Sequence, residues 1–118
     1  MKEGDVILTP VPQADGVVKN RPAIALREMP PYKDLLVCGV STQLHQQVKD
    51  FDEILSPSDA DFGESGVRAT SLIRLGFLAV LSRSNIIGSI GSVSRRRNAR
   101  LLKRLSDYLV QKDTRRKL

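Results

Sequence analysis

Two short stretches of the sequence carry side chains that could bind a phosphate and act on it. Arg21 stands directly before Pro22, which restricts the arginine to an extended conformation at the start of an apolar run. Ser41, Thr42 and Gln43 follow a second apolar run. If the two runs pair as neighbouring strands, the guanidinium, hydroxyl and amide groups meet at one end of the sheet. A guanidinium matches phosphate geometry and hydroxyls add neutral donors, so this pattern predicts an anion-binding site.

Two further features bear on how such a site could act. Adjacent residues of a strand face opposite sides of a sheet, so only one of the hydroxyls of Ser41 and Thr42 is expected to reach the site. His45 is a candidate general base, since the ordinary imidazole pKa of about 6.5 suits proton transfer at neutral pH. Its neighbours between residues 43 and 49 are mostly polar, which favours an exposed loop histidine instead.

Other kinds of catalytic or cofactor site find little support in the sequence. The chain has one His and one Cys, which excludes a zinc site built from those residue types. It lacks a glycine-rich phosphate loop and the HExxH, CxxC and Gly-x-Ser-x-Gly motifs. The acidic residues between positions 56 and 66 are typical of a solvated loop rather than of a two-carboxylate catalytic pair. We therefore expect no metal and no cofactor.

The elements that must position these groups are short extended runs divided by Gly, Pro and Asp turns. No helical crossover lies between the runs, which favours a mainly β fold, a strongly bent barrel or small sandwich of about seven strands. The predicted strands are 5–9, 21–27, 35–41, 51–55, 67–75, 77–81 and 86–93. A loop of about ten residues follows the first strand, and the second and third strands are expected to pair as a hairpin. Cys38, in the third strand, is predicted to be a buried thiol.

A single helix is predicted at the end of the sequence, over residues 95–111, with Ser94 as its N-cap. Apolar residues recur there at three- and four-residue spacing, which forms one stripe along the helix. These residues are Leu101, Leu102, Leu105, Tyr108 and Leu109.

The length of 118 residues predicts one domain. We expect the strands within residues 1–94, the helix at 95–111 packed on them, and a basic, disordered tail at 112–118. The lone cysteine and the lack of a signal-like or membrane-length apolar run favour a cytoplasmic protein that does not enter the membrane.

The net charge of +6 is unevenly distributed. Residues 95–118 hold ten basic and two acidic residues, a net of +8, whereas the rest holds nine basic and eleven acidic residues, a net of −2. The helix is therefore either a track for RNA or an acidic partner, or a charged cover for one end of the sheet. Arg95, Arg96 and Arg97 lie where the helix dipole is already positive, which suggests an anionic neighbour. With aromatic residues at only 4%, a platform of rings for single-stranded bases is disfavoured.

The order of several short motifs is similar to that of a known family. GDV stands near the start, NRPAIAL follows the first loop, VSTQ ends the third strand, and ESGVRATSLIRL precedes an IGSIGSVS strand and the terminal helix. Over residues 3–111 the chain resembles the MazF/PemK family of toxins from bacterial toxin–antitoxin modules. The motifs are individually weak, but their order and spacing together are specific.

The resemblance implies an SH3-like or CcdB-like barrel that forms a homodimer. It also implies a metal-independent, sequence-selective endoribonuclease that cleaves single-stranded messenger RNA. In such enzymes an RNA 2′-hydroxyl attacks the adjacent phosphate and leaves a 2′,3′-cyclic phosphate and a 5′-hydroxyl. A cognate antitoxin, through an acidic C-terminal segment, is implied to block the substrate groove. The resemblance places the catalytic pair on Arg21 and Ser41, with Thr42 as the alternative hydroxyl.

Departures from the family pattern leave alternatives open. Some members carry a carboxylate where this chain reads VRATSLIR, so Thr70 or Ser71 stands in its place and neither is basic. A subgroup has basic residues in that stretch, and Arg68 and Arg74 match it as candidate phosphate contacts. The other RNA-binding candidates are Lys19, Gln43, His45 and Thr70. Two rival functions remain: CcdB-like poisoning of DNA gyrase without nuclease activity, and an inactive relative that binds an antitoxin or nucleic acid.

Overall fold

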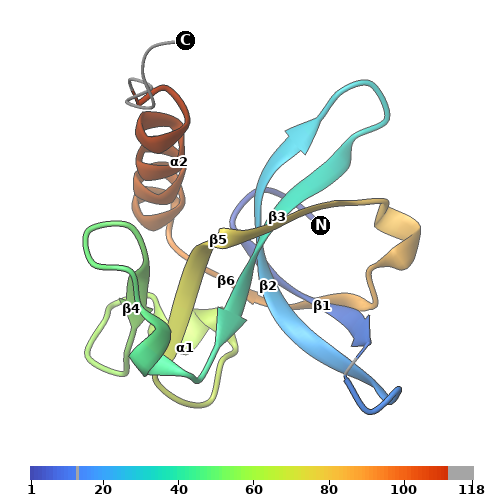
Figure 1. Cartoon of the computed structure of the whole chain (residues 1–118), viewed down its shortest axis with the longest axis horizontal. Helices are drawn as coiled ribbons and strands as arrows, with labels where there is room; N and C mark the ends of the chain where they lie inside the picture. The colour runs from blue at the N-terminus through green and yellow to red at the C-terminus, as the bar shows by residue number, and fades with distance from the viewer. Residues whose placement is uncertain (13, 112–118) are drawn as a thin grey trace, which may run out of the picture.

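The computed structural model describes residues 1–12 and 14–111, and within them six antiparallel strands form one curled sheet (Figure 1). The sheet order is β4-β5-β3-β2-β1-β6. The strands are β1 (Asp5–Pro12), β2 (Val18–Met29), β3 (Asp34–Ser41), β4 (Glu53–Leu55), β5 (Ser71–Leu81) and β6 (Gly88–Ser92). The helices are α1 (Phe62–Ser65) and α2 (Arg95–Leu109), with 3-10 turns at Leu44–Gln46 and Arg83–Asn85. This arrangement confirms the predicted mainly β, barrel-like fold with a terminal helix.

The strand boundaries differ from the predicted runs in three places. The runs at 67–75 and 77–81 form one strand, β5, so the described residues contain six strands rather than seven. The first loop is shorter than predicted, because residues 10–12 pair with residues 18–20 in spite of two prolines. β4 begins only at residue 53, since the backbone N–H groups of residues 51 and 52 donate to Val48 O in a turn. The predicted tail at 112–118 lies outside the described residues.

Register shifts in three strand pairs bend the sheet. Such bulges add residues to one strand of a pair and increase its local twist. They fall between Val6 and Ile7 in the β1–β6 pair, between Ala25 and Arg27 in the β2–β3 pair, and between Cys38 and Gly39 in the β3–β5 pair. The sheet consequently curls around a concave face instead of lying flat (Figure 1).

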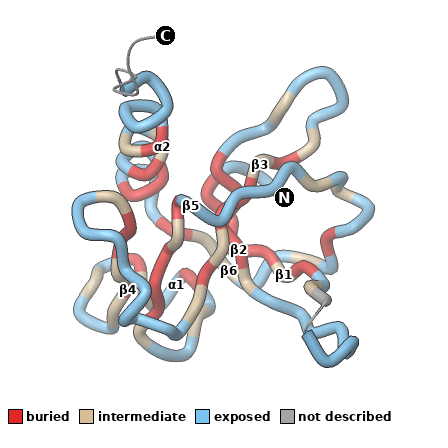
Figure 2. Tube along the Cα trace, viewed as in Figure 1, coloured by how far each residue is buried: buried red, intermediate tan, exposed pale blue. Residues whose placement is uncertain are grey.

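Buried residues lie along the strands and on α2 (Figure 2), and they form two core clusters. The main cluster contains strand residues such as Ile24 and Cys38, together with Leu101 and Leu105 of α2. The smaller cluster contains the intervening strand residues, which point to the opposite face, together with Ile86 from the segment before β6. Its members are Ile7, Ala23, Ala25, Leu35, Val37 and Ile86. Helix α2 thus contributes only to the main cluster, and the second face has only a small core of its own.

Arginine–carboxylate ion pairs attach α2 to the rest of the molecule. Ser94 caps the helix as predicted, with its Oγ accepting a hydrogen bond from Arg97 N at 3.0 Å. Arg97 is only 6% exposed. Its guanidinium donates to Asp61 at 2.9 and 3.1 Å and to Glu53 at 2.8 Å. Arg100 donates to the same Glu53 at 2.7 Å. The anionic neighbour predicted for the first turn of the helix therefore lies within the chain itself.

The same ion pairs correct the expectation that residues 56–66 form a solvated loop. Asp61 is buried beneath α2, and Asp59 lies 3.2 Å from Arg97 Nη2. Burial alone would raise the pKa of Asp61, but the hydrogen bonds from Arg97 and Ser94 N lower it to about 2. Burial likewise opposes ionisation of Glu53, yet Arg100, Arg104 and Arg97 lower its pKa below the usual value. Within residues 56–66, the carboxylates that contact α2 therefore stabilise the packing of the helix.

Two glycines allow α1 to end directly against β6. Gly66 follows the helix with a φ of +79°, a left-handed conformation that side chains disfavour. A Cβ on Gly66 would overlap the carbonyl of Ile90, and a Cβ on Gly91 would overlap the backbone of residues 64 and 65. The short helix and the edge strand can approach this closely only because neither position carries a side chain.

Candidate functional site

The strand register brings the predicted anion-binding groups to one end of the sheet. In the β2–β3 hairpin, which confirms the predicted pairing, Ala23 pairs with Gly39. Continuing that register by two residues places Arg21 opposite Ser41. On the other side of β2, Arg21 pairs with Thr9 of β1. Side chains at every second position share a face, so these residues lie on the face that carries the smaller core cluster.

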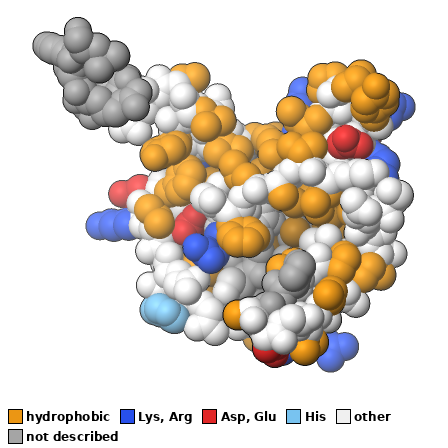
Figure 3. Space-filling view, turned by 45° about the vertical axis from the view of Figure 1, so that its right-hand side comes forward, with side chains coloured by type: hydrophobic (Ala, Val, Ile, Leu, Met, Phe, Trp, Pro, Cys, Tyr) orange, Lys and Arg blue, Asp and Glu red, His pale blue; other side chains and the backbone are white. Residues whose placement is uncertain are grey.

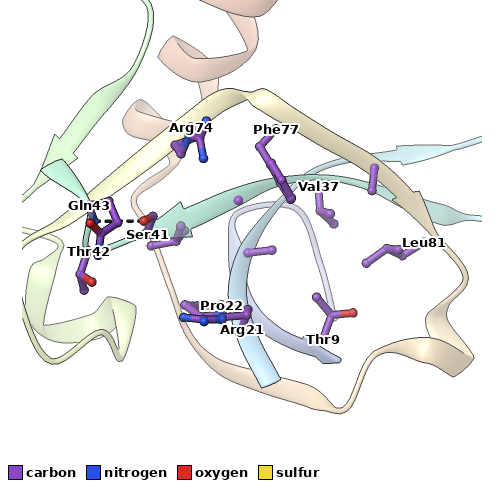
Figure 4. Close-up of a pocket in the computed structure, with 14 residues that line it drawn as sticks. Thr9, Arg21, Pro22, Val37, Ser41, Thr42, Gln43, Arg74, Phe77 and Leu81 are labelled. Atoms are coloured by element: carbon purple, nitrogen blue, oxygen red, sulfur yellow. Dashed lines mark hydrogen bonds between the residues drawn. The ribbon is translucent and has the colours of Figure 1, made fainter. Parts of the chain in front are cut away.

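These residues line a cavity of about 300 Å³ between β1, β2, β3 and β5 (Figure 4). A volume of this size lies within the range of small-ligand sites. The polar lining consists of Thr9, Arg21, Ser41, Thr42, Gln43 and Arg74. The remaining lining residues are Pro22, Ala23, Val37, Gly39, Val40, Phe77, Ala79 and Leu81. The cavity therefore has a polar side and an apolar side.

The structure gathers some of the sequence-predicted site residues in this cavity and leaves others outside it. The lining includes the predicted Arg21, Ser41, Thr42, Gln43 and Arg74. It does not include Lys19, exposed on β2, or His45, exposed in the 3-10 turn after β3. Arg68 and Thr70, in the segment before β5, also lie outside the lining.

Ser41 and Thr42, at the end of β3, both belong to the residues that line the cavity. Strand alternation does not govern Thr42, because β3 ends at Ser41. Ser41 Oγ accepts a hydrogen bond from Gln43 N at 3.0 Å, drawn as a dashed line in Figure 4. Since Oγ accepts this bond, the Ser41 hydroxyl proton can be donated to a ligand in the cavity.

The cavity has a positive lining. Arg21 projects from β2 and Arg74 from β5, on opposite sides of the cavity in Figure 4. Among the described lining residues there is no Asp, Glu or His. The described lining residues therefore carry two guanidinium groups and no acidic side chain, and none of them is an ordinary general base. The arrangement suits binding of an anion and stabilisation of negative charge that develops on it.

Sequence reasoning missed Thr9 and Phe77. Thr9 is 8% exposed and enters the site through its pairing with Arg21. Thr9 could have been found by pairing the predicted first strand with the second, which places Thr9 beside Arg21. Phe77 reaches the cavity through a bulge in β5, and the only sequence signal for that bulge is Gly76 within an apolar run.

Three further observations concern other kinds of site. Within residues 1–12 and 14–111, no group of three or more His, Cys, Asp and Glu side chains is placed to hold a metal ion. In the same residues no helix has both the length and the apolar character that a membrane span requires. Cys38 is buried, as predicted, and burial raises the pKa of its thiol to about 12.

Comparison with known proteins assigns the chain to a family. A search of curated proteins found no match. Residues 2–109, by contrast, match the family described as PemK-like, MazF-like toxin of type II toxin–antitoxin systems. The matched region contains all strands, both helices and every residue that lines the cavity. The chain therefore belongs to the PemK-like, MazF-like family of type II toxin–antitoxin toxins, as the sequence resemblance predicted.

Proposed function

We propose that this toxin is an endoribonuclease that cleaves single-stranded RNA, messenger RNA in particular, at selected sequences and without a metal ion. The observation that carries the proposal is the cavity lining. Arg21 and Arg74 line it together with the hydroxyl-bearing residues Thr9, Ser41 and Thr42, and no carboxylate lies among its described residues. A phosphodiester fits such a lining, because guanidinium groups and hydroxyls donate hydrogen bonds to its oxygens.

The proposed reaction is an internal transfer at one phosphate. The ribose 2′-oxygen attacks the adjacent phosphorus, the bond from phosphorus to the 5′-oxygen breaks, and the proton lost from the 2′-oxygen is balanced by one gained at the 5′-oxygen. The products are a 2′,3′-cyclic phosphate and a 5′-hydroxyl. DNA lacks the attacking hydroxyl and is not cleaved. The transition state carries more negative charge on the phosphoryl oxygens than the substrate does, so cationic donors accelerate the step.

In this proposal the side chains act by charge and position. Arg21 stabilises the charge that develops on the phosphoryl oxygens, and Ser41 donates its hydroxyl proton to one of these oxygens. Arg74 adds positive charge on the opposite side of the cavity. A guanidinium group gives up its proton only with difficulty, so arginine is a poor proton acceptor. We therefore assign none of the lining side chains as general base, and ascribe catalysis to orientation and electrostatic stabilisation.

The proposal extends to the partners of the toxin. We propose a homodimer in the cytoplasm, with a cognate antitoxin whose acidic C-terminal segment occupies the cavity and competes with RNA. The two cavity arginines support this assignment, since an acidic segment complements their charge.

The test is cleavage of a long single-stranded RNA by purified protein in EDTA, with end-group analysis of the fragments. Arg21→Ala and Ser41→Ala are compared with Thr42→Ala to decide which hydroxyl matters. Lys19→Ala is the matched control, because Lys19 lies on the same strand as Arg21 but outside the cavity. We expect cyclic-phosphate ends, a loss of at least about 100-fold for Arg21→Ala, and little change for Lys19→Ala.

The competing functions are outcomes of the same experiment. A folded protein, free of antitoxin, that cleaves none of a varied set of RNAs overturns the nuclease proposal. Inhibition of DNA gyrase would then identify a CcdB-like toxin, and binding without either activity would identify an inactive relative. Cleavage that stops in EDTA would contradict the metal-independent reaction.

A further inference from the structure

Phe77 is the one aromatic residue among the described residues that line the cavity, and its ring is 55% exposed. We propose that Phe77 and Arg74 form a stacking subsite that binds a nucleobase beside the phosphate held by Arg21 and Ser41. This inference rests on the proposed function and deepens it, because it assigns the apolar side of the cavity to a base and the polar side to the cleaved phosphate.

A bulge in β5 places the ring in the cavity. Gly39 of β3 pairs with Arg74, whereas the next pair along the strands is Cys38 with Leu78. The three residues between Arg74 and Leu78 therefore have no partner in β3. The first of them, Leu75, donates its backbone N–H to the buried carboxylate of Asp52 at 3.0 Å. This hydrogen bond stabilises the bulge, because the Leu75 N–H group has an acceptor within the protein instead of in solvent.

The ring is held in place from β3 and from its own strand. A Cβ built on Gly39 would lie 3.0 Å from Cδ1 of Phe77, so the ring packs closely on β3 at a position where a larger residue would push the ring aside. The Arg74 guanidinium carbon lies 5.7 Å from the ring centroid, within the range of a cation–π contact. In Figure 4 the Phe77 side chain points from β5 into the cavity, with Arg21 on the opposite side.

The chemistry of this arrangement favours a flat aromatic ligand. A base stacks on an aromatic ring whatever its identity, and a neighbouring arginine adds to the stacking. The apolar surroundings continue from Phe77 to Val37, Ala79 and Leu81. Hydrophobic side chains form much of one face of the molecule, with Lys and Arg scattered among them and few Asp or Glu (Figure 3). Because Arg21 and Ser41 line the same cavity away from Phe77 (Figure 4), a base and its phosphate can bind together.

The stacking subsite needs only one aromatic ring, which the low aromatic content of the chain allows. The 4% aromatic content argues against a platform of several rings. A single ring in the right place is enough for one base. The subsite therefore predicts that the toxin depends on one stacked nucleotide next to the cleaved bond, and not on an extended run of stacked bases.

The experiment compares Phe77→Leu and Phe77→Tyr with the unmodified protein on RNAs that contain one abasic nucleotide. The abasic position is moved in turn to each side of the cleaved bond. We expect Phe77→Leu to raise KM for intact RNA about 5- to 100-fold, and Phe77→Tyr to retain a KM close to that of the unmodified protein. When the abasic nucleotide occupies the stacked position, no base remains to stack on the ring. This RNA should therefore bind the unmodified protein and the Phe77→Leu protein equally weakly. An equal penalty for Phe77→Leu at every abasic position, or no penalty on intact RNA, overturns the subsite.

A fluorescence measurement gives a second readout that does not depend on cleavage. The chain contains no Trp, so Phe77→Trp introduces a single tryptophan, whose emission can be excited apart from that of the two tyrosines. The probe is an RNA with a 2′-deoxy nucleotide at the cleaved position, which binds but cannot react. Stacking should quench Phe77→Trp emission on addition of this RNA, while the control Tyr32→Trp, 81% exposed on the β2–β3 hairpin, should change little.

Failure of the proposed function and failure of the stacking subsite give different results in these experiments. Unmodified protein that neither cleaves nor binds RNA overturns the proposed function and the subsite together. Unmodified protein that cleaves RNA, with Phe77→Trp emission unaffected by bound RNA, overturns the subsite alone.

Discussion

Arg97 is the clearest case of one side chain that holds distant parts of the chain together. It is buried at the start of α2 and donates to Asp61 and Glu53, which lie before α1 and in β4. Removing one member of a buried ion pair leaves the other charges unpaired, which costs about 3–5 kcal/mol. We expect Arg97→Met to lower the free energy of unfolding by this amount in urea titrations.

Arg96→Met is the matched control for that prediction. Arg96 is exposed on the same turn of the helix, so its replacement should change the free energy of unfolding by less than about 0.5 kcal/mol. Equal effects of the two variants would contradict a structural role for the buried ion pairs.

Cys38 offers a second prediction for a single residue. Its thiol is completely buried in the main core, and burial raises its pKa to about 12. The reactive form of cysteine is the thiolate, which is scarce at pH 8 when the pKa is this high. The native protein should therefore react with a disulfide reagent such as DTNB only as fast as it unfolds. Rapid reaction without denaturant would contradict the burial.

Among the elements, β5 shows how a single carboxylate shapes the site. Asp52 accepts hydrogen bonds from Leu75 N in the bulge and from Val48 N in the preceding turn, one on each oxygen. Asparagine has only one acceptor oxygen, so Asp52→Asn leaves one of these N–H groups without its partner. We expect the free energy of unfolding to fall by about 1–3 kcal/mol.

The same variant should also affect RNA binding, because the bulge that Asp52 supports carries Phe77. Asp50→Asn, two residues away and exposed, is the control and should leave both properties unchanged. Urea titration measures the first property and binding of the 2′-deoxy RNA measures the second. Normal stability and binding in Asp52→Asn would show that the bulge does not need this acceptor.

The elements also show what the sequence could predict and what it could not. The pairing of β2 with β3 and the helix with its Ser94 cap follow from local patterns: apolar runs, a proline and a capping residue. The division of β5 into two runs was wrong because Gly76, which resembles a turn residue, lies in a bulge within one strand. A bulge depends on the register with β3 and on an acceptor from Asp52, and neither contact is local in sequence.

The residues of the candidate site were likewise predictable only where local sequence patterns placed them. Arg21 and Ser41 could be inferred because Arg21 begins one apolar run and Ser41 ends another. The strand register places the two residues opposite each other. His45, Arg68 and Thr70 lie in segments between strands, where periodicity gives no information about direction, and they lie outside the cavity. Phe77 required knowledge of the bulge.

At the scale of the whole molecule, the basic helix and the acidic body compensate each other. Asp61 and Glu53 have pKa values below their usual range, to about 2 for Asp61, because they face the arginines of α2. A carboxyl whose pKa is lowered by folding stabilises the native state above its unfolded pKa. This contribution disappears as the pH falls from about 4 toward 2.

We therefore expect the melting temperature to fall steeply below about pH 4 at constant ionic strength. In Arg97→Met, where the cation responsible for much of the shift is missing, the fall over the same range should be shallower. Thermal unfolding at several pH values between 6 and 2 measures both proteins. A melting temperature that is constant down to pH 2 would contradict these ion pairs.

The position of α2 at the end of the described chain has a consequence for synthesis. A ribosome that has translated only as far as residue 94 has made every strand, but not Leu101 and Leu105 of the main core or the cations that neutralise Glu53 and Asp61. Such a nascent chain lacks part of its core and contains carboxylates without partners, so we expect a chain that ends at residue 94 to be degraded readily by protease. We therefore expect the sheet to become stable only after α2 has been made and has packed on the main core cluster.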